Sequence, residues 1–404
     1  MDLPFLTRDL PPVPGAIKQQ PEDFCVEEIP LYEPCGAGTH VYFRIEKRNV
    51  TTIKIVRDIA RALNVKARDI GYAGLKDARA VTRQMLSVEH VDPERIETLA
   101  LPSVRVLDVS QHGNKLRLGH LRGNRFAIKL RESPGEMLDR VREVLSIVSR
   151  RGVPNYFGPQ RFGTRGDTWR IGRAMIRQDW RECIDVMLGG PGEGGGADVR
   201  QARELYEDGR YAEAAEAWPW SFRDEKRACR ALARTDSHRR AFFAVDKTLK
   251  RLYVSAYQGW LFNQVTAARI DALDRVMAGD LAWLHGKGAV FRVENAEAEQ
   301  ARCDAHEISP SGPLFGYRMT EPDGEPGRVE QQVLAAQGVG PEAFRAAGAH
   351  KVKGGRRPLR FVPTECSAEC GRDKSGEFIE LRFVLPSGCY ATALLREICK
   401  TDFA

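Results

Sequence analysis

Asp77 is a residue whose type and setting could support nucleophilic chemistry. It ends the glycine-rich turn 71–77, directly follows Lys76, and lies close in sequence to Arg79 and Arg83. Nearby positive charge favours the ionised form of a carboxyl group, and an ionised, positioned carboxylate can serve as a nucleophile. The simpler interpretation is that Asp77 is a turn residue among solvated surface charges, and spacing alone favours it.

A second candidate site consists of Asn124 and Phe126, at the start of an expected strand. Two residues apart on a strand, their side chains share a face. An aromatic ring beside an amide could receive a nucleobase, because the ring can stack on the base while the amide hydrogen-bonds to its edge. Alternatively, Phe126 is a core residue and Asn124 completes a Gly-Asn turn. Phe24 and Tyr390 are further single aromatics, and each alone is more often a packing residue.

The charge distribution permits an RNA partner without requiring one. The 404 residues include 62 Lys and Arg against 55 Asp and Glu, which gives a net charge of +7. Basic and aromatic residues interleave at 238–243 and 247–253, where phosphate contacts and a solvated helix face fit the pattern about equally. A second basic cluster favours RNA phosphates. It contains Lys351, Lys353, Arg356 and Arg357.

The cysteines predict neither a disulfide framework nor a metal site. There are nine, an odd and scattered set, which indicates a reducing compartment. The closest pair, Cys366 and Cys370, would need two more ligands to hold zinc, and no second Cys or His pair has suitable spacing. No apolar run is long enough to span a membrane, and residues 1–8 do not resemble a signal peptide. We therefore expect a cytoplasmic protein without membrane contact.

Local patterns predict the elements that would position the candidate residues. Residues 40–46 alternate as a strand, and Thr51 or Thr52 can cap a helix that runs to Leu63. The apolar face of this helix is predicted to contain Ile53, Val56, Ala60 and Leu63. Further strands are expected at 81–88, 104–109, 116–119 and, after a turn at 120–124, at 126–131. The outer face of the last strand is predicted to be basic, with Arg125, Lys129 and Arg131.

The pattern then changes from β-rich to helical and back. A helix is expected at 137–148, and residues 169–276 are mostly helical apart from a glycine-rich loop at 189–196. Alternation returns at 379–385, and a short helix is expected at 391–398. This order is typical of a helical domain inserted into an α+β domain.

A set of motifs spans nearly the whole chain. They are residues 18–28 (KQQPEDFCVEE), 74–84 (GLKDARAVTRQ), 123–126 (GNRF), 155–163 (NYFGPQRFG), 257–263 (YQGWLFN), 309–314 (SPSGPL) and 385–397 (LPSGCYATALLRE). In this order they resemble the TruD family of tRNA pseudouridine synthases, and the combination is far more specific than any one motif.

The resemblance implies an α+β fold with two domains. A pseudouridine synthase core with a mixed, largely antiparallel sheet would comprise residues 1–154 and 352–404, and residues 155–351 would form an inserted, mainly helical TRUD-type domain. Two stretches depart from the family pattern, at 189–196 and around Cys366 and Cys370. Both are interpreted as loop insertions that leave the chemistry intact.

The resemblance also implies an activity and its residues. The expected reaction is isomerisation of a specific uridine of tRNA, uridine 13 as in bacterial relatives, to pseudouridine, without a metal or organic cofactor. Asp77 matches the catalytic aspartate, and Phe126 matches the ring that stacks on the target base. The other substrate-pocket matches are Phe24, Asn124, Lys18 near the aspartate, and Tyr390, which is commonly Phe in bacterial relatives. The expected partner is tRNA, and we expect a monomer without an obligatory protein partner.

Three other interpretations remain open. A non-catalytic RNA-binding protein on the same fold would not need Asp77. A hydrolase or glycosylase could pair Asp77 with a second carboxylate such as Glu28, and it would release free base. A metalloprotein could use Cys366 and Cys370.

Overall fold

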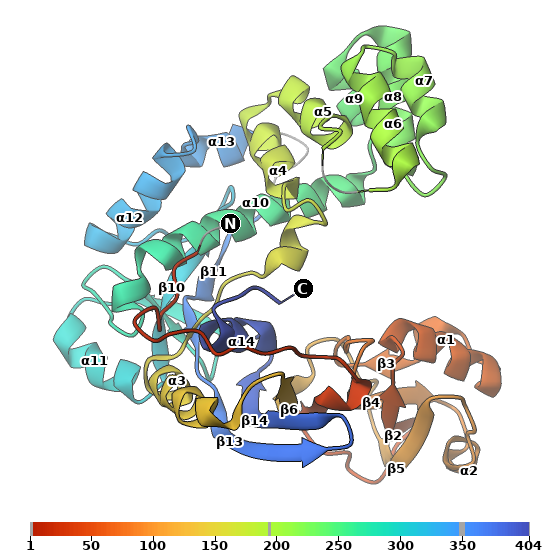
Figure 1. Ribbon diagram of the computed structural model, residues 1–404, viewed down its shortest axis with the longest axis vertical. Helices are drawn as coiled ribbons and strands as arrows, with labels where there is room; N and C mark the ends of the chain where they lie inside the picture. The colour runs from red at the N-terminus through yellow and green to blue at the C-terminus, as the bar shows by residue number, and fades with distance from the viewer. Residues whose placement is uncertain (1–2, 193–194, 347–351, 404) are drawn as a thin grey trace. The chain divides into compact units, whose positions relative to one another are not determined.

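The computed structural model describes residues 3–192, 195–346 and 352–403, which form two compact units (Figure 1). The unit that we call the sheet unit comprises Thr7–Val153 and Phe361–Thr401. The other, the helical unit, comprises Met1–Leu6, Pro154–Arg360 and Asp402–Ala404. The short strands β7 (Val153–Pro154) and β12 (Arg360–Phe361) lie at two of the places where the chain passes between the units.

The sheet unit is built on one mixed sheet, eight-stranded within the described residues, with the order β13-β14-β6-β1-β4-β2-β5 and β3 paired to β4. Neighbouring strands are antiparallel except β1 and β4, which are parallel. The predicted α+β class with a largely antiparallel sheet is therefore confirmed. The strands are β1 (Phe24–Pro30), β2 (His40–Arg48), β3 (Gly71–Tyr72), β4 (Val81–Glu89), β5 (Val104–His112), β6 (Leu121–Arg131), β13 (Thr364–Asp373) and β14 (Gly376–Pro386).

Helix α1 (Thr52–Leu63) covers part of this sheet (Figure 1). Thr51 caps it as predicted, because its hydroxyl oxygen accepts a hydrogen bond from the Lys54 amide at 3.2 Å. Ile53, however, is 37% exposed, so the predicted apolar face is wrong at this position. Ile53 lies about 200° around the helix from Ile55, which is buried. The core beneath α1 is formed by Ile55, Val56, Ile59 and Leu63 with Val41, Phe43, Ile45, Leu86 and Val88 of β2 and β4.

The other helical elements of the sheet unit are short except α3. They are α2 (Pro93–Glu97), α3 (Leu138–Arg151), α14 (Ala391–Cys399), and the 3-10 turns η1 (Pro21–Asp23), η2 (Ala67–Asp69) and η3 (Gly135–Met137). The helices predicted at 137–148 and 391–398 are confirmed as α3 and α14.

Four further predictions for the sheet unit are wrong. Residues 116–119 do not form a strand, and β6 begins at Leu121, so Asn124 lies within a strand and not in a turn. Arg131 is buried and does not belong to a basic outer face. Its guanidinium donates to Asp23 (Nε to Oδ1, 2.8 Å) and to Asp373 (Nη1 to Oδ1, 3.0 Å). Residues 366–370, interpreted as a loop insertion, lie in β13, which pairs with β14.

The helical unit contains a four-stranded sheet with the order β11-β10-β8-β9 in the described residues, together with a group of helices that pack mainly on one another. Its strands are β8 (Leu281–Leu284), β9 (Ala289–Arg292), β10 (Ile308–Leu314) and β11 (Gly355–Pro358). Its helices are α4 (Thr168–Arg177), α5 (Trp180–Leu188), α6 (Ala197–Glu207), α7 (Tyr211–Ala217), α8 (Arg223–Thr235), α9 (His238–Phe243), α10 (Lys247–Ala268), α11 (Ala296–Asp304), α12 (Gly324–Ala335) and α13 (Pro341–Ala346), with the 3-10 turns η4 (Pro159–Phe162) and η5 (Ile270–Ala272). The predicted glycine-rich loop at 189–196 falls partly on residues 193–194, outside the described residues.

Two of the sequence motifs meet inside the helical unit. Asn263 of α10 accepts a hydrogen bond from the Phe157 amide through Oδ1 (2.8 Å) and donates to the Phe157 carbonyl through Nδ2 (2.9 Å). A buried backbone must have its polar groups paired, and here one side-chain amide pairs both groups of a single residue. These motif residues therefore have a structural role.

Arg356 and Arg357 of the second basic cluster belong to the same interior, whereas Lys353 is exposed. Both arginines lie on β11, which pairs with β10 in the helical unit, whereas the sequence had assigned residues 352–404 to the core. The Arg356 side chain is buried and forms an ion pair with Glu330 at 2.7 Å. Arg357 lies over the Phe157 ring, 4.6 Å from its centre. The prediction that this cluster contacts phosphate is wrong for Arg356, and Lys351 lies outside the described residues.

No helix in the described residues is long and apolar enough to cross a membrane.

Candidate active site

One face of the sheet unit's sheet carries three of the six predicted site residues, Phe24, Asn124 and Phe126. In the register of the sheet, Asn124 of β6 is opposite Glu28 of β1, and Phe126 of β6 is opposite Phe383 of β14. Residues directly opposite each other on antiparallel strands project to the same face. The face therefore presents an amide, a carboxylate and aromatic rings side by side.

Asp77 lies in the loop between β3 and β4, and main-chain contacts hold the loop at both residues of the Lys76-Asp77 pair. The Lys76 amide donates to the hydroxyl oxygen of Thr52, the first residue of α1, at 3.0 Å. The Asp77 carbonyl accepts a hydrogen bond from Lys47 Nζ at 2.9 Å. The backbone of Asp77 is therefore held in place. Its side chain is half exposed, at 49%, so the carboxylate is accessible to a ligand.

Lys18 forms an ion pair with the Asp77 carboxylate. Its Nζ lies 3.7 Å from Asp77 Oδ2 and 4.3 Å from the centre of the Phe24 ring. The Lys18 backbone is in the left-handed region, with φ of 57°. For a non-glycine residue this conformation costs roughly 1–2 kcal/mol, so surrounding contacts must hold it. The arrangement places one positive charge between an aromatic ring and the candidate nucleophile.

Lys47 was not predicted as a site residue. Its buried Nζ donates to the carbonyls of Val50 (2.7 Å) and Asp77 (2.9 Å). Burial lowers the pKa of Lys47 to about 8, while the charge of Asp77 acts in the opposite direction. A sequence signal does exist: Lys47 continues the inward alternation of Val41, Phe43 and Ile45 on β2. A lysine in the inward register of a strand indicates a specific buried partner.

A buried cation also joins Glu28 to Asn124. Lys76 Nζ lies 2.9 Å from Glu28 Oε2 and donates to Asn124 Oδ1 at 2.7 Å. Glu28 Oε1 accepts a further hydrogen bond from the Met85 amide at 3.3 Å. Glu28 is thus engaged by a lysine, which disfavours its use as the second carboxylate of a glycosylase. Sequence analysis treated Lys76 only as a neighbour of Asp77 and did not predict these partners.

The aromatic residues form a packed group. Phe126 is 6% exposed and stacks on Phe383, with ring centres 5.4 Å apart and an angle of 27° between the rings. Phe24 meets Phe126 edge-on, with centres 6.1 Å apart. Phe383 is a residue that sequence analysis assigned only to an alternating strand. The Phe126 ring is therefore held in one orientation by aromatic neighbours on different strands.

Tyr390 is placed differently from the other predicted residues. It is the residue before α14, and its side chain is 53% exposed. Within the described residues, no hydrogen bond, ion pair or ring contact joins its side chain to Asp77, Lys18 or Asn124. Direct contacts thus connect Lys18, Phe24, Asp77 and Phe126, and Lys76 connects Asn124 to Glu28.

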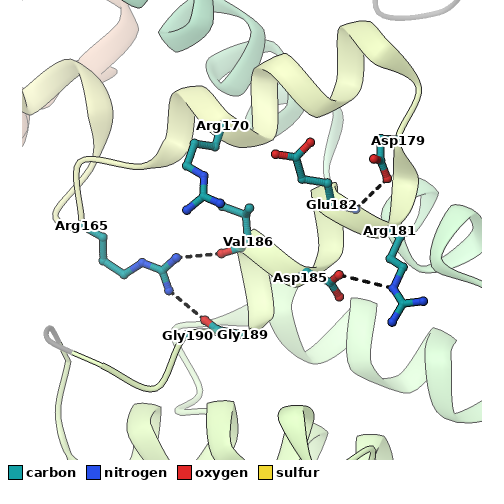
Figure 2. Close-up of a pocket in the computed structure, with 9 residues that line it drawn as sticks. All are labelled: Arg165, Arg170, Asp179, Arg181, Glu182, Asp185, Val186, Gly189 and Gly190. Atoms are coloured by element: carbon teal, nitrogen blue, oxygen red, sulfur yellow. Dashed lines mark hydrogen bonds and ion pairs between the residues drawn. The ribbon is translucent and has the colours of Figure 1, made fainter. Parts of the chain in front are cut away.

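A separate hollow of about 440 Å³ lies in the helical unit, beside α4 and α5 (Figure 2). Its most prominent cation, Arg165, donates to the carbonyls of Val186 (2.8 Å) and Gly189 (3.0 Å). These carbonyls belong to the last turn of α5, where helix C-termini need donors. Carboxylates of Asp179, Glu182 and Asp185 also line the hollow. Its charge is mixed, and Arg165, one of its three arginines, has a capping role, so it is a weaker candidate site than the face around Asp77.

Within the described residues, no three or more His, Cys, Asp or Glu side chains are grouped as a metal site would require.

Comparison with known proteins gives one consistent result. The family model described as "tRNA pseudouridine synthase D (TruD)" matches residues 1–398. A tRNA pseudouridine synthase D of Geobacter sulfurreducens is 47% identical over 400 residues, covering 99% of this chain and 97% of the relative. One of Anaeromyxobacter dehalogenans is 38% identical over 403 residues, with coverage of 99% and 97%. A crystal structure from Methanosarcina mazei, provisionally assigned as a tRNA pseudouridine synthase D, matches with a TM-score of 0.88 at 27% identity, covering 100% of this chain and 99% of that one.

Proposed function

The chain belongs to the TruD family of tRNA pseudouridine synthases, and from this membership we propose that Asp77 is the nucleophile that acts on a flipped-out uridine of tRNA. The enzyme is a tRNA pseudouridine synthase, which isomerises uridine to pseudouridine. We further propose uridine 13 as the target. This position is the one that the resemblance to bacterial members of the family implies.

The contact that carries the proposal is the one between Lys18 and Asp77, at 3.7 Å. It places a positive charge beside a half-exposed carboxylate, and a positioned, accessible carboxylate can act as a nucleophile. Phe24, in contact with the same lysine, is only 1% exposed, so its ring supports Lys18 from the core and does not itself face a ligand. The carboxylate is the accessible member of this group, and a ribose could be reached by it.

The proposed reaction begins with rotation of the target nucleotide out of its stack. This costs a few kcal/mol, which contacts in the pocket must offset. Phe126 and Tyr390 would contribute aromatic contacts, with the buried Phe24 ring packed against Phe126 behind them, and Asn124 would hydrogen-bond the base edge. Asp77 then acts on the ribose and the bond from C1′ to N1 of uracil breaks.

The released uracil stays in the pocket, rotates, and forms a bond from its C5 to C1′, after which the C5 proton is lost. Asp77 could add to C1′ or remove the C2′ proton, and both routes need its ionised form. Product and substrate are isomers, so the reaction consumes no oxidant, reductant or group donor. We therefore propose that no cofactor takes part.

We assign the catalytic role to the sheet unit and propose that the helical unit is the inserted TRUD-type domain. Asp77 and all the predicted substrate contacts belong to the sheet unit. The enzyme would act in the cytoplasm as a monomer, without an obligatory protein partner.

The testing experiment incubates unmodified total tRNA with the protein or with its Asp77→Asn variant, and maps pseudouridine at single-nucleotide resolution. We expect a new pseudouridine at position 13 with the unmodified enzyme and none with the variant. Equal modification by both proteins would exclude Asp77 as the nucleophile. Release of free uracil would indicate a glycosylase instead.

A further inference from the structure

The contact between Lys76 and Asn124 fixes which end of the Asn124 amide faces the protein. Lys76 Nζ lies 2.7 Å from the Asn124 side chain. A lysine ammonium has three donors and no acceptor, so the amide atom that faces it must be the oxygen. The oxygen and nitrogen of an amide are usually hard to distinguish by position alone, but here the chemistry of the partner decides.

The ammonium is itself held in place. The Lys76 side chain is only 5% exposed, and its partner Glu28 is 2% exposed. Glu28 is tied to the β4 backbone through the Met85 amide, and the Lys76 backbone is tied to Thr52. A buried charge that loses its partner is strongly unfavourable, so this pair resists rearrangement.

With its oxygen turned to Lys76, the amide has its nitrogen left to donate. Asn124 Nδ2 makes no hydrogen bond within the part of the chain that the structure describes, and the residue is only half-buried. It lies on the same sheet face as Phe126, two residues along β6. This face of the sheet therefore presents a hydrogen-bond donor of fixed position.

We propose that Lys76 is a positioning residue that selects uracil over cytosine by orienting Asn124. The inference deepens the function proposed above and rests on it. Asn124 Nδ2 donates to the 4-oxygen of the target uracil, which accepts a hydrogen bond. Cytosine carries an amino group at that position, so two donors would face each other and an unpaired buried donor would result.

The test measures binding in the Asp77→Asn background, where turnover does not interfere. Dissociation constants are determined for target tRNA that carries either uridine or cytidine at the modified position. We expect uridine to bind roughly 10- to 100-fold more tightly, the range for one well-placed hydrogen bond to a base edge.

Two further variants then distinguish the role of Asn124, which donates the hydrogen bond, from that of Lys76, which orients the amide. The double variant Glu28→Gln/Lys76→Gln removes both buried charges but keeps hydrogen-bonding groups. The Asn124 amide can then rotate by 180°. The ratio of the dissociation constants for cytidine and uridine tRNA should therefore fall toward one. In Asn124→Asp the donor is replaced by an acceptor, and the preference should be lost or reversed. A preference that is unchanged in the double variant, with its melting temperature preserved, would overturn the role of Lys76.

An RNA-side measurement keeps the inference testable if the double variant does not fold. Target tRNA with 2-pyrimidinone, which lacks the 4-oxygen, should bind the Asp77→Asn protein about tenfold more weakly than uridine tRNA. Equal binding would overturn the inference. An enzyme that forms pseudouridine but binds uridine and cytidine tRNA equally would overturn only this inference, whereas absence of pseudouridine with the unmodified enzyme would overturn the proposed function as well.

Discussion

The ammonium of Lys18 lies 3.7 Å from the carboxylate of Asp77, and the two come from segments far apart in the sequence. Lys18 reaches this position from a left-handed backbone conformation and also contacts the Phe24 ring. Its side chain is largely buried, whereas that of Asp77 is half exposed. Lys18 is therefore the more buried partner of the ion pair, and the Asp77 carboxylate is the more accessible partner.

Replacing Lys18 by Met should lower kcat on the order of tenfold, as loss of a contact worth about 1.4 kcal/mol in the transition state would. The substitution keeps the length of the side chain but removes the ammonium that lies beside the Asp77 carboxylate. Single-turnover kinetics with unmodified tRNA measure the effect. Lys18→Arg, which keeps the charge, is the matched control and should retain most of the rate. An unchanged rate in Lys18→Met would remove Lys18 from this role.

Lys47 should make the stability of the protein depend on pH in a defined direction. Its pKa in the folded protein is lowered to about 8 from 10.5, chiefly by burial. Between these values the unfolded chain binds more protons than the folded one, so the free energy of unfolding contributed by Lys47 rises with pH. Urea unfolding at pH 7 and pH 10 should show that the wild type gains stability relative to Lys47→Met at the higher pH. The same difference at both pH values would contradict the assignment.

Local sequence patterns predicted the elements better than they predicted the contacts of the site. Alternation and periodicity gave the strand that contains Phe43, the helix capped by Thr51, and the closing helix α14, because each pattern is confined to consecutive residues. The placement of Lys18 beside Asp77 depended on the family resemblance. No local pattern connects Lys76 with Glu28 or Asn124, because the register of three strands and a loop brings them together.

Charged residues were the hardest to place from the sequence. Arg131 alternates with apolar residues as an outward cation would, and Arg356 belongs to a basic cluster that is typical of a phosphate contact. Both are buried because acidic partners distant in sequence, Asp23 and Glu330, compensate their charge. A charge pattern shows only which charged residues lie close in sequence. Whether an arginine is buried depends on an acidic partner that the folded chain brings to it.

The ion pair of Arg131 with Asp23 should be far more important for stability than the one with Asp373. Asp23 is fully buried, and removing one partner of a buried pair leaves an uncompensated charge, at a cost of about 3–5 kcal/mol. Asp23→Ala should therefore lower the free energy of unfolding by about that amount in urea titrations. Asp373→Ala is the matched control, and its effect should be clearly smaller because Asp373 is partly exposed. Equal losses in the two variants would contradict this ranking.

Lowering the pH should remove the contribution of Asp373 to the stability of the fold over a defined pH range. Hydrogen bonds from Arg131 and Lys129 hold the pKa of Asp373 well below its usual range. A carboxyl group with a lowered pKa stabilises the fold above its unfolded pKa of about 4 and loses that effect as pH falls toward the folded value. Between pH 5 and pH 3 the wild type should lose more stability than Asp373→Asn. Parallel losses would show that Asp373 does not carry this linkage.

Tyr390 should contribute to tRNA binding through its ring and not through its hydroxyl group. The side chain is about half exposed, and among the described residues its hydroxyl makes no hydrogen bond. Tyr390→Phe, which removes only the hydroxyl group, should therefore change kcat and KM by less than about threefold, the range of a substitution without an altered contact. Tyr390→Ala removes the ring, and loss of one aromatic stacking contact should raise KM on the order of tenfold, since such contacts contribute about 1–3 kcal/mol per base. Steady-state kinetics with unmodified tRNA would separate the two. If Tyr390→Phe lost as much activity as Tyr390→Ala, the hydroxyl would have to bind the substrate directly, and the aromatic role proposed for this position would be wrong.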